Sequence, residues 1–216
     1  MSNNRNVTRQ TTLFPDEIFH GILDEKCHIE FRDHPRYLME SYYDLLESDI
    51  EDSTLKAELK KLINKEPDFL CPYLTLIEIL KEENQISEAN KVLENAYTQA
   101  LNLILDESGR WPGKLEASWI PNWHIIITIF EKAIYLWETG KTDDSLDLFR
   151  KLLKTNPNDD FGARNYVLGI LLDFDCREFH KWVNNNENYE AVLEWFDENQ
   201  KKFSDEFNHD PSKVNP

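Results

Sequence analysis

The tripeptide Asp160-Phe161-Gly162 is the first stretch of the sequence whose residue types could do chemistry. In a protein kinase, the aspartate of D-F-G binds the magnesium ion of ATP and works with a Gly-rich loop, a strand lysine and an H-R-D catalytic loop. These partners are missing, because the six glycines are nowhere spaced as G-x-G-x-x-G and Arg32-Asp33 lacks the preceding histidine. The sequence therefore argues against a kinase. We expect Asp160 to begin a helix that Asn158 or Asp159 caps.

Cys176 and His180 are a second candidate, because residues four apart share one face of a helix. A structural zinc site usually takes four ligands from two short clusters. The second cluster is missing here, and Cys27-His28 with His34 is similarly incomplete. The chain also has no G-x-S-x-G or H-E-x-x-H motif. We predict no catalytic residues, no metal and no cofactor, with an unrecognised enzyme site near Cys176 and His180 as an alternative.

The composition favours an all-helical protein. The chain has 216 residues and only six glycines, and its apolar residues rarely alternate with polar ones over the length of a strand. Its 41 acidic and 24 basic residues give a net charge of −17. Such a charge repels nucleic-acid phosphates and anionic membranes, so neither is an expected partner. The acidic surface either keeps the protein in solution or attracts a basic partner.

Three scattered cysteines do not form a disulfide framework and are typical of a reducing compartment. The N-terminal residues MSNNRNVTRQTT lack the apolar run of a signal peptide. The run IIITIF at 125–130 is far too short to cross a bilayer. These features predict a cytoplasmic protein.

A helical repeat is visible between Leu136 and Pro157. A tetratricopeptide unit of about 34 residues needs a glycine that ends its first helix, a small residue where its two helices cross, two apolar positions and a closing proline. Gly140, Ser145, Phe149, Leu152 and Pro157 have these types at the required spacing. Ala89 occupies the small position of the preceding unit. The pattern predicts stacked pairs of antiparallel helices.

The same spacing predicts that residues 13–204 form a single helical-repeat domain. Helix pairs are predicted near 36–48 with 53–64, 72–84 with 87–105, and 121–139 with 142–155. Residues 105–124 contain two glycines and two prolines, so they should form an insertion loop whose tryptophans fold back on the array. A helix from Asp160 should be the first helix of a fourth unit. A short helix near 175–184 and a last helix near 187–203 should then form an atypical C-terminal cap. Residues 1–12 and 205–216 are predicted to be disordered.

Three motifs together carry a resemblance to a known family. They are Trp111-Pro112-Gly113, Asn122-Trp123, and Asn156-Pro157-Asn158-Asp159 followed by Gly162 and Arg164. Over residues 70–174 the chain resembles a family of bacterial tetratricopeptide-repeat proteins with a W-P-G loop and an N-P-N-D-x-x-G-x-R signature. The family usually has an arginine where this chain has Trp123. The resemblance implies a right-handed superhelix that acts as a scaffold or binding module, without catalytic residues.

The first helices of such units line a concave groove. The predicted partner-binding residues change from acidic to apolar along it: Tyr37, Glu40, Asp44, Glu47, Glu78, Glu82, Phe130, Ile134, Trp137, Arg164 and Asn165. The acidic residues could instead serve only solubility, and the 105–124 loop or the last helix could cover the apolar ones. We expect a non-catalytic scaffold that binds a protein or peptide. The alternative is an acidic regulator that occupies the basic site of a nucleic-acid-binding protein.

Overall fold

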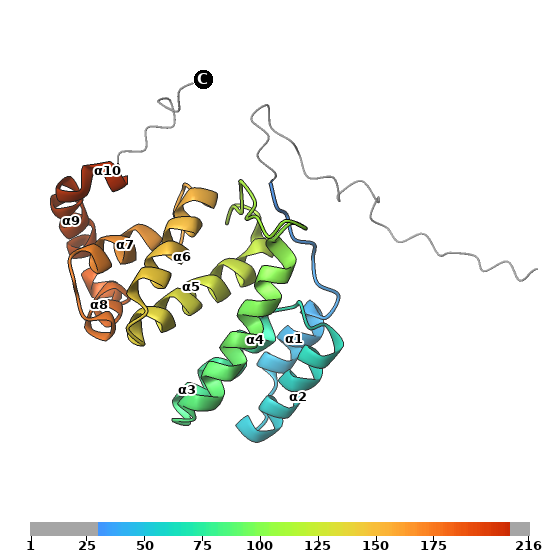
Figure 1. The fold of residues 1–216 in the computed structure, drawn as a ribbon. Helices are drawn as coiled ribbons and strands as arrows, with labels where there is room; N and C mark the ends of the chain where they lie inside the picture. Colours follow the sequence, from blue (N-terminus) through green and yellow to red (C-terminus); the bar gives the residue numbers. More distant parts are fainter. Residues whose placement is uncertain (1–29, 208–216) are drawn as a thin grey trace, which may run out of the picture.

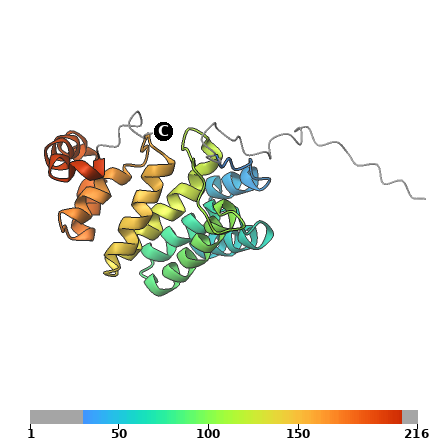
Figure 2. The ribbon, with the colours of Figure 1, turned by 45° about the horizontal axis from the view of Figure 1, so that its top comes forward.

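The structure is a computed structural model and describes residues 30–207. These residues form helices and no strand, and one isolated bridge joins Glu30 to Lys114. Successive helices pack on one another, so the chain runs in order from one end of the molecule to the other (Figures 1 and 2). The helices are α1 Met39–Glu47, α2 Asp52–Lys65, α3 Cys71–Glu82, α4 Ile86–Ile104, α5 Trp123–Glu138, α6 Thr142–Thr155, α7 Ala163–Leu171, α8 Cys176–Val183, α9 Tyr189–Asn199 and α10 Ser204–Phe207. The predicted all-helical class and the three helix pairs are confirmed.

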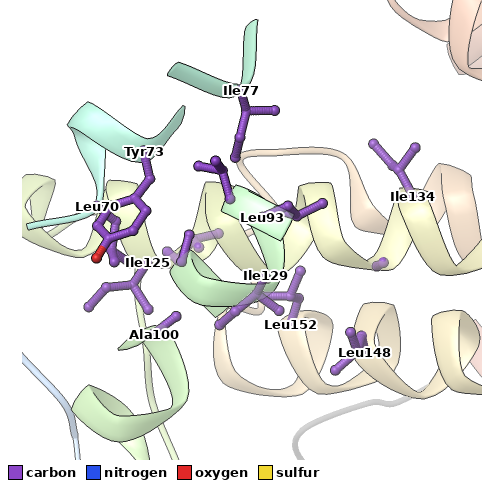
Figure 3. Packing of buried hydrophobic residues seen from close by; sticks show 14 of the residues in the cluster. Leu70, Tyr73, Ile77, Leu93, Ala100, Ile125, Ile129, Ile134, Leu148 and Leu152 are labelled. Atoms are coloured by element: carbon purple, nitrogen blue, oxygen red, sulfur yellow. The ribbon is translucent and has the colours of Figure 1, made fainter. Parts of the chain in front are cut away.

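The core runs through the helix pairs without a break. Side chains from α3, α4, α5 and α6 meet in one apolar cluster (Figure 3). Ala89 and Ser145 are fully buried where the second helix of each pair crosses the first. The Ser145 hydroxyl also donates to the carbonyl of Ala133 at 2.7 Å, which ties α6 to α5. A small side chain at this position therefore allows a close helix crossing.

The turns inside the helix pairs repeat one backbone geometry. Asn84, Gly140 and Asp173 follow α3, α5 and α7 with positive φ angles of 61°, 77° and 59°. In each turn the next N–H donates to a carbonyl five residues back, namely Gln85 to Leu80, Lys141 to Leu136 and Phe174 to Gly169. This is the Schellman ending of a helix. Gly140 and Asp173 lie about one 34-residue repeat apart.

The ends of α2 and α6 also match each other. Glu66 and Asn156 follow these helices with similar backbone angles, and a proline comes next in both cases. Both side chains are buried and accept a backbone N–H from another segment, Glu66 from Leu38 and Asn156 from Ala117. The two repeat units therefore share their connections as well as their helices.

The 105–122 segment folds back on the array, as predicted. Its backbone is fixed by a hydrogen bond from Leu115 N–H to the carbonyl of Thr155 at 2.8 Å. Trp111 stacks on the ammonium of Lys151, and the indole N–H of Trp119 donates to the carbonyl of Asp33 at 2.6 Å. Trp123 differs from its neighbours, because it begins α5 and is 46% exposed.

The start of the fourth unit needs a correction. The helix begins at Ala163 and not at Asp160, because Gly162 has a φ of 72° that no right-handed helix contains. Asp159 does cap this helix, and its carboxylate accepts from the N–H groups of Ala163 and Arg164 at 2.6 and 3.1 Å. Asp160-Phe161-Gly162 is therefore the turn before α7. The ring of Phe161 packs against that of Trp123, with their centroids 6.0 Å apart.

The C-terminal elements follow the prediction with two differences. The last helix is shorter than 187–203, because α9 ends at Asn199 and a 3-10 turn over Gln200–Phe203 follows. Residues 204–207 then form α10, where Glu206 pairs with Arg150 at 2.5 Å. The predicted disordered tail therefore begins too early at 205. Residues 1–12 and 208–216 lie outside the described part of the chain.

Candidate functional site

Three carboxylates gather on neighbouring first helices of the array. Glu78 and Glu82 lie on α3 and are exposed, and Glu131 lies on α5. The only described cation paired with this group is Lys81, whose Nζ lies 3.0 Å from Glu131 Oε2. Burial raises the pKa of Glu78, and the negative charges of Glu131 and Glu82 act in the same direction. We call Glu78, Glu82, Glu131 and Lys81 the inner acidic cluster.

Helix α1 extends the acidic surface toward the N-terminal end. Glu40, Asp44 and Glu47 are all exposed there, and none forms an ion pair with another described residue. The Tyr42 hydroxyl lies 2.8 Å from Thr75 Oγ1, which links α1 to α3. Burial raises the pKa of Tyr42 to about 12, and Glu78 is among the charges that contribute. The predicted acidic residues of α1 and α3 therefore lie on adjoining helices.

Tyr37 lies before α1 and is 69% exposed. Its hydroxyl donates to the carbonyl of Lys65 at 3.2 Å, so the ring reaches across to the end of α2. Its ring is therefore largely exposed to solvent near the end of α2.

The apolar part of the predicted groove needs a correction, because most of it belongs to the core. Ile134 and Trp137 are buried at 6% and 7% exposure. Phe130 is half-buried between Phe149 and Tyr166, with ring centroids 5.1 and 4.9 Å away. The aromatic side chains that cover these residues are Phe149 on α6, Tyr166 on α7 and Phe179 on α8. Helix α8 packs on this side of α5, which the repeat pattern did not show.

Arg164 and Asn165 do not join the inner acidic cluster. Arg164 pairs with Asp159 at 2.6 Å, and its guanidinium lies 5.9 Å from the ring centroid of Phe196 on α9. Asn165 is half-buried in the first turn of α7. The contacts of Arg164 place it at the junction of α7 with α9, while Asn165 contacts Gly162 at the start of α7.

A polar cluster with His180 lies at the C-terminal end of the inner face. The Tyr166 hydroxyl lies 2.7 Å from His180 Nδ1, and the Asn184 amide contacts both groups at 3.0 and 3.1 Å. Burial lowers the pKa of His180, and the charges that act on it include Glu131 and Lys81. The inner acidic cluster and His180 therefore face the same region. Sequence reasoning noted His180 as a possible metal ligand and as part of an alternative enzyme site, but did not predict its contacts with Tyr166 and Asn184.

A buried charge network, which the sequence did not reveal, joins residues 30–37 to the array. Arg36 donates three hydrogen bonds to the two carboxylate oxygens of Asp33, at 2.6 to 3.0 Å. Its Nη1 lies 2.6 Å from the partly exposed Asp68 in an ion pair without hydrogen-bond geometry. Glu66 is 3.8 Å from the same nitrogen. His124 Nε2 lies 2.7 Å from Asp33 Oδ2. We call Asp33, Arg36, Glu66, Asp68 and His124 the Arg36 network.

The Asp33–His124 pair resembles the carboxylate–histidine pair of some active sites, but both ring nitrogens of His124 are already hydrogen-bonded. His124 Nδ1 accepts the N–H of Leu70 at 3.1 Å, so Nε2 carries the proton that it donates to Asp33. A general base needs a free lone pair within reach of a nucleophile. Both ring nitrogens are occupied and the side chain is 3% exposed, so this pair serves to hold three segments together.

Asn122, from the motif quoted above, reinforces the same junction. Its side chain is fully buried, accepts the N–H of Asp33 and donates to the carbonyls of Phe31 and Glu116. Together with the bonds from Trp119 to Asp33 and from Phe31 to Lys114, this amide ties the W-P-G loop to residues 30–37.

Residues 30–207 contain two free cysteines, Cys71 and Cys176. Burial raises the pKa of Cys71 to about 11 and that of Cys176 to about 12, so neither is a thiolate at neutral pH. Cys176 Sγ contacts the carbonyl of Ile134 at 3.8 Å, while His180 Nδ1 is engaged by Tyr166. Within the described range, no three His, Cys, Asp or Glu side chains are arranged to hold a metal ion. No helix in that range is both long and apolar enough to cross a bilayer.

Comparison with known proteins yields no matching family model, curated protein or solved structure.

Proposed function

We propose that the protein is a non-catalytic tetratricopeptide-like scaffold whose inner face binds a basic segment of a partner protein. The repeat is supported by the equivalent turns at Asn84, Gly140 and Asp173 and by the equivalent helix ends at Glu66 and Asn156. Helix pairs joined in this way stack into a right-handed superhelix with the first helices on the concave side. In this arrangement α8, α9 and α10 form the atypical C-terminal cap.

The observation that carries the proposal is the unbalanced charge of α1 and α3. Five exposed carboxylates lie on these two helices, and the described residues supply only Lys81 as a cation on the same surface. Like charges three or four residues apart destabilise a helix by a few tenths of a kcal/mol each. A segment rich in lysine or arginine would relieve this repulsion. Such pairs set the association rate and the specificity more than the affinity.

The states of Cys71, Cys176 and His124 support a binding role. Cys71 and Cys176 are protonated at neutral pH, and a protonated thiol is a weak nucleophile. His124 has both nitrogens engaged. We also propose a cytoplasmic location, because Cys71 and Cys176 are free thiols.

The test compares two triple variants with the same change in charge. In the first, Glu40, Asp44 and Glu78 on the inner face are changed to Lys. The control changes Glu58, Glu88 and Asp147 to Lys, on the second helices α2, α4 and α6, where each carboxylate makes only an exposed ion pair of small energetic value. Both variants should keep the helical circular dichroism of the parent.

Partners are first captured from native lysate with the parent protein at two salt concentrations, and association rates are then measured at low salt. We expect the inner-face variant to associate at least about tenfold more slowly, the scale of electrostatic steering. The control should stay close to the parent rate. Equal rates for all three proteins would contradict the proposal. Capture of a nucleic-acid-binding protein that DNA displaces would favour the acidic-regulator alternative.

A further inference from the structure

Helix α8 lies as a cover on the apolar part of the inner face. It packs beside α5 and α7 (Figure 1), where the Phe179 ring lies 5.7 Å from those of both Trp137 and Tyr166. Cys176, at its first turn, contacts the carbonyl of Ile134. Ile134 and Trp137 are buried by this helix, although the repeat pattern places them on the surface that binds partners. The cover therefore hides the apolar contacts that a partner segment would use.

The cover is short and is bounded by irregular backbone on both sides. Asp173 precedes it with a φ of 59°, and a turn over Asn184–Asn188 follows it. An open hollow of about 280 Å³ lies at its first turn and is lined by Trp137, Phe174 and Cys176, among others. An eight-residue helix gains little stability from its own backbone, so its position depends on tertiary contacts.

The polar contacts of this helix with α7 meet at one ring nitrogen. Tyr166 on α7 lies 2.7 Å from His180 Nδ1, and the Asn184 amide nitrogen lies 3.1 Å from the same atom. The Asn184 amide nitrogen also donates to the backbone carbonyl of His180 at 2.8 Å. Because a carbonyl only accepts, this bond fixes the orientation of the Asn184 amide. The same amide nitrogen donates to the Tyr166 hydroxyl at 3.0 Å, so both of its protons are used and the Tyr166 proton can point at Nδ1. With Nδ1 accepting this proton, the ring is neutral.

Protonation of His180 would turn the acceptor into a donor. Nδ1–H and the Asn184 N–H₂ would then face each other, and the Tyr166 hydroxyl proton would lose its acceptor. Burial lowers the pKa of His180 below its usual value near 6.5, opposed by Glu131 and Glu138 on α5 and assisted by Lys81 on α3. A lowered pKa means that the closed state prefers the neutral ring. Its stability is complete above about pH 6.5 and declines as the pH falls toward the lowered value.

We propose that α8 is a pH-sensitive cover, held closed by the Tyr166–His180–Asn184 contacts, whose release exposes Ile134 and Trp137 on the inner face. Opening is a local unfolding of α8 and leaves the helix pairs α1 to α6 in place. The inference rests on the proposed function only for what the opened surface would bind. The opening itself is a property of the chain alone, and it is tested without a partner.

The experiment uses Cys176 as a reporter of opening and Cys71 on α3 as its control. Two single-cysteine proteins are made, one with Cys27 and Cys71 changed to Ser and one with Cys27 and Cys176 changed to Ser. Each is labelled with a dithiopyridine reagent, which reacts with thiols in acid, between about pH 7.5 and about pH 5.5. Rates for the same chains in urea correct for intrinsic reactivity. The ratio of the two rates gives the protection of each thiol.

Protection of Cys176 should fall about fivefold or more across this range, the factor set by losing one net hydrogen bond, and protection of Cys71 should not change. His180→Asn keeps an acceptor but cannot take a proton, so in that variant the protection of Cys176 should be independent of pH. Constant protection of Cys176 in the parent, or an equal fall at Cys71, would overturn the proposal. A normal pH response in His180→Asn would overturn the role of the histidine. None of these outcomes bears on whether the acidic residues bind a partner.

Discussion

Gly169, in the middle of α7, allows a sharp test of how the fourth unit packs. At an ordinary exposed helix position, glycine to alanine stabilises a protein by about 1 kcal/mol, because alanine has the higher helix propensity. At this position a Cβ atom would lie 2.8, 2.9 and 3.0 Å from three ring carbons of Phe179. Normal carbon contacts are about 3.5 Å or longer. The ring would therefore have to move by about half an ångström.

Phe179 has little room for such a movement. Its ring is surrounded by Trp137, Tyr166, Trp182 and Trp195, with centroid distances between 5.3 and 5.9 Å. Overpacking a full core costs about 1–3 kcal/mol. Subtracting the gain in propensity leaves a net loss of about 1 kcal/mol for Gly169→Ala, which lowers the melting temperature by about 2–4 °C in a domain of this size.

The assay is thermal unfolding of four proteins: the parent, Gly169→Ala, Phe179→Leu and the double variant. Leucine removes the ring carbons nearest to the new methyl group, so Gly169→Ala should become neutral or stabilising in the Phe179→Leu background. The change of sign isolates the contact from the general cost of losing the ring. If Gly169→Ala raises the melting temperature of the parent protein, the close packing of α8 on α7 is refuted.

The remaining predictions concern the first three units. Ala89→Leu or Ser145→Leu should each cost about 1–3 kcal/mol of unfolding free energy by wedging a helix crossing, as measured by urea unfolding; unchanged midpoints would refute the assigned repeat positions. Arg36→Met should cost about 3–5 kcal/mol, because it leaves buried carboxylates without their cation. Burial alone would raise the pKa of Asp33, but contacts with His124 and Arg36 outweigh it and lower that pKa. The contribution of Asp33 to the free energy of unfolding is therefore present above about pH 4 and lost below it. Unfolding of the parent and of Asp33→Asn, measured as the pH is lowered, checks this loss.

The sequence predicts the helix pairs well because their signals are local. Gly140 is needed for a positive φ angle, Ser145 for a close crossing, and Pro157 cannot continue a helix. Each signal acts within a few residues of its own position. The boundaries of the three helix pairs agree with the structure within a few residues for this reason.

The start of α7 shows where this approach fails. Asp159 and Gly162 both have positive φ angles, so the chain makes an additional turn before the helix. The repeat spacing places a helix at this point but does not specify how the backbone enters it. Asp159 was a candidate cap, and only the structure shows that it reaches Ala163 across this turn.

The apolar half of the groove and the Arg36 network depend on contacts between distant segments. Phe179 on α8 covers Trp137 on α5, three helices earlier in the chain. Asp33 and His124 are separated by 91 residues. No periodicity relates such residues, and a single sequence gives no covariation to pair them. The repeat pattern also assigns Trp137 to an open surface, because it assumes a complete array beyond the third unit.

The Arg36 network and the acidic face are connected through α1. This helix ends the described array on one side, and like charges on its surface disfavour it by a few tenths of a kcal/mol per pair. Glu66 accepts the N–H of Leu38 at the start of α1, while Arg36 joins Asp33 before α1 to Asp68 before α3. The network therefore fixes the N-terminal end of α1 against α3, which stabilises a helix that its own charges disfavour. If the acidic face binds a partner as proposed, this anchoring would hold its charges at fixed positions.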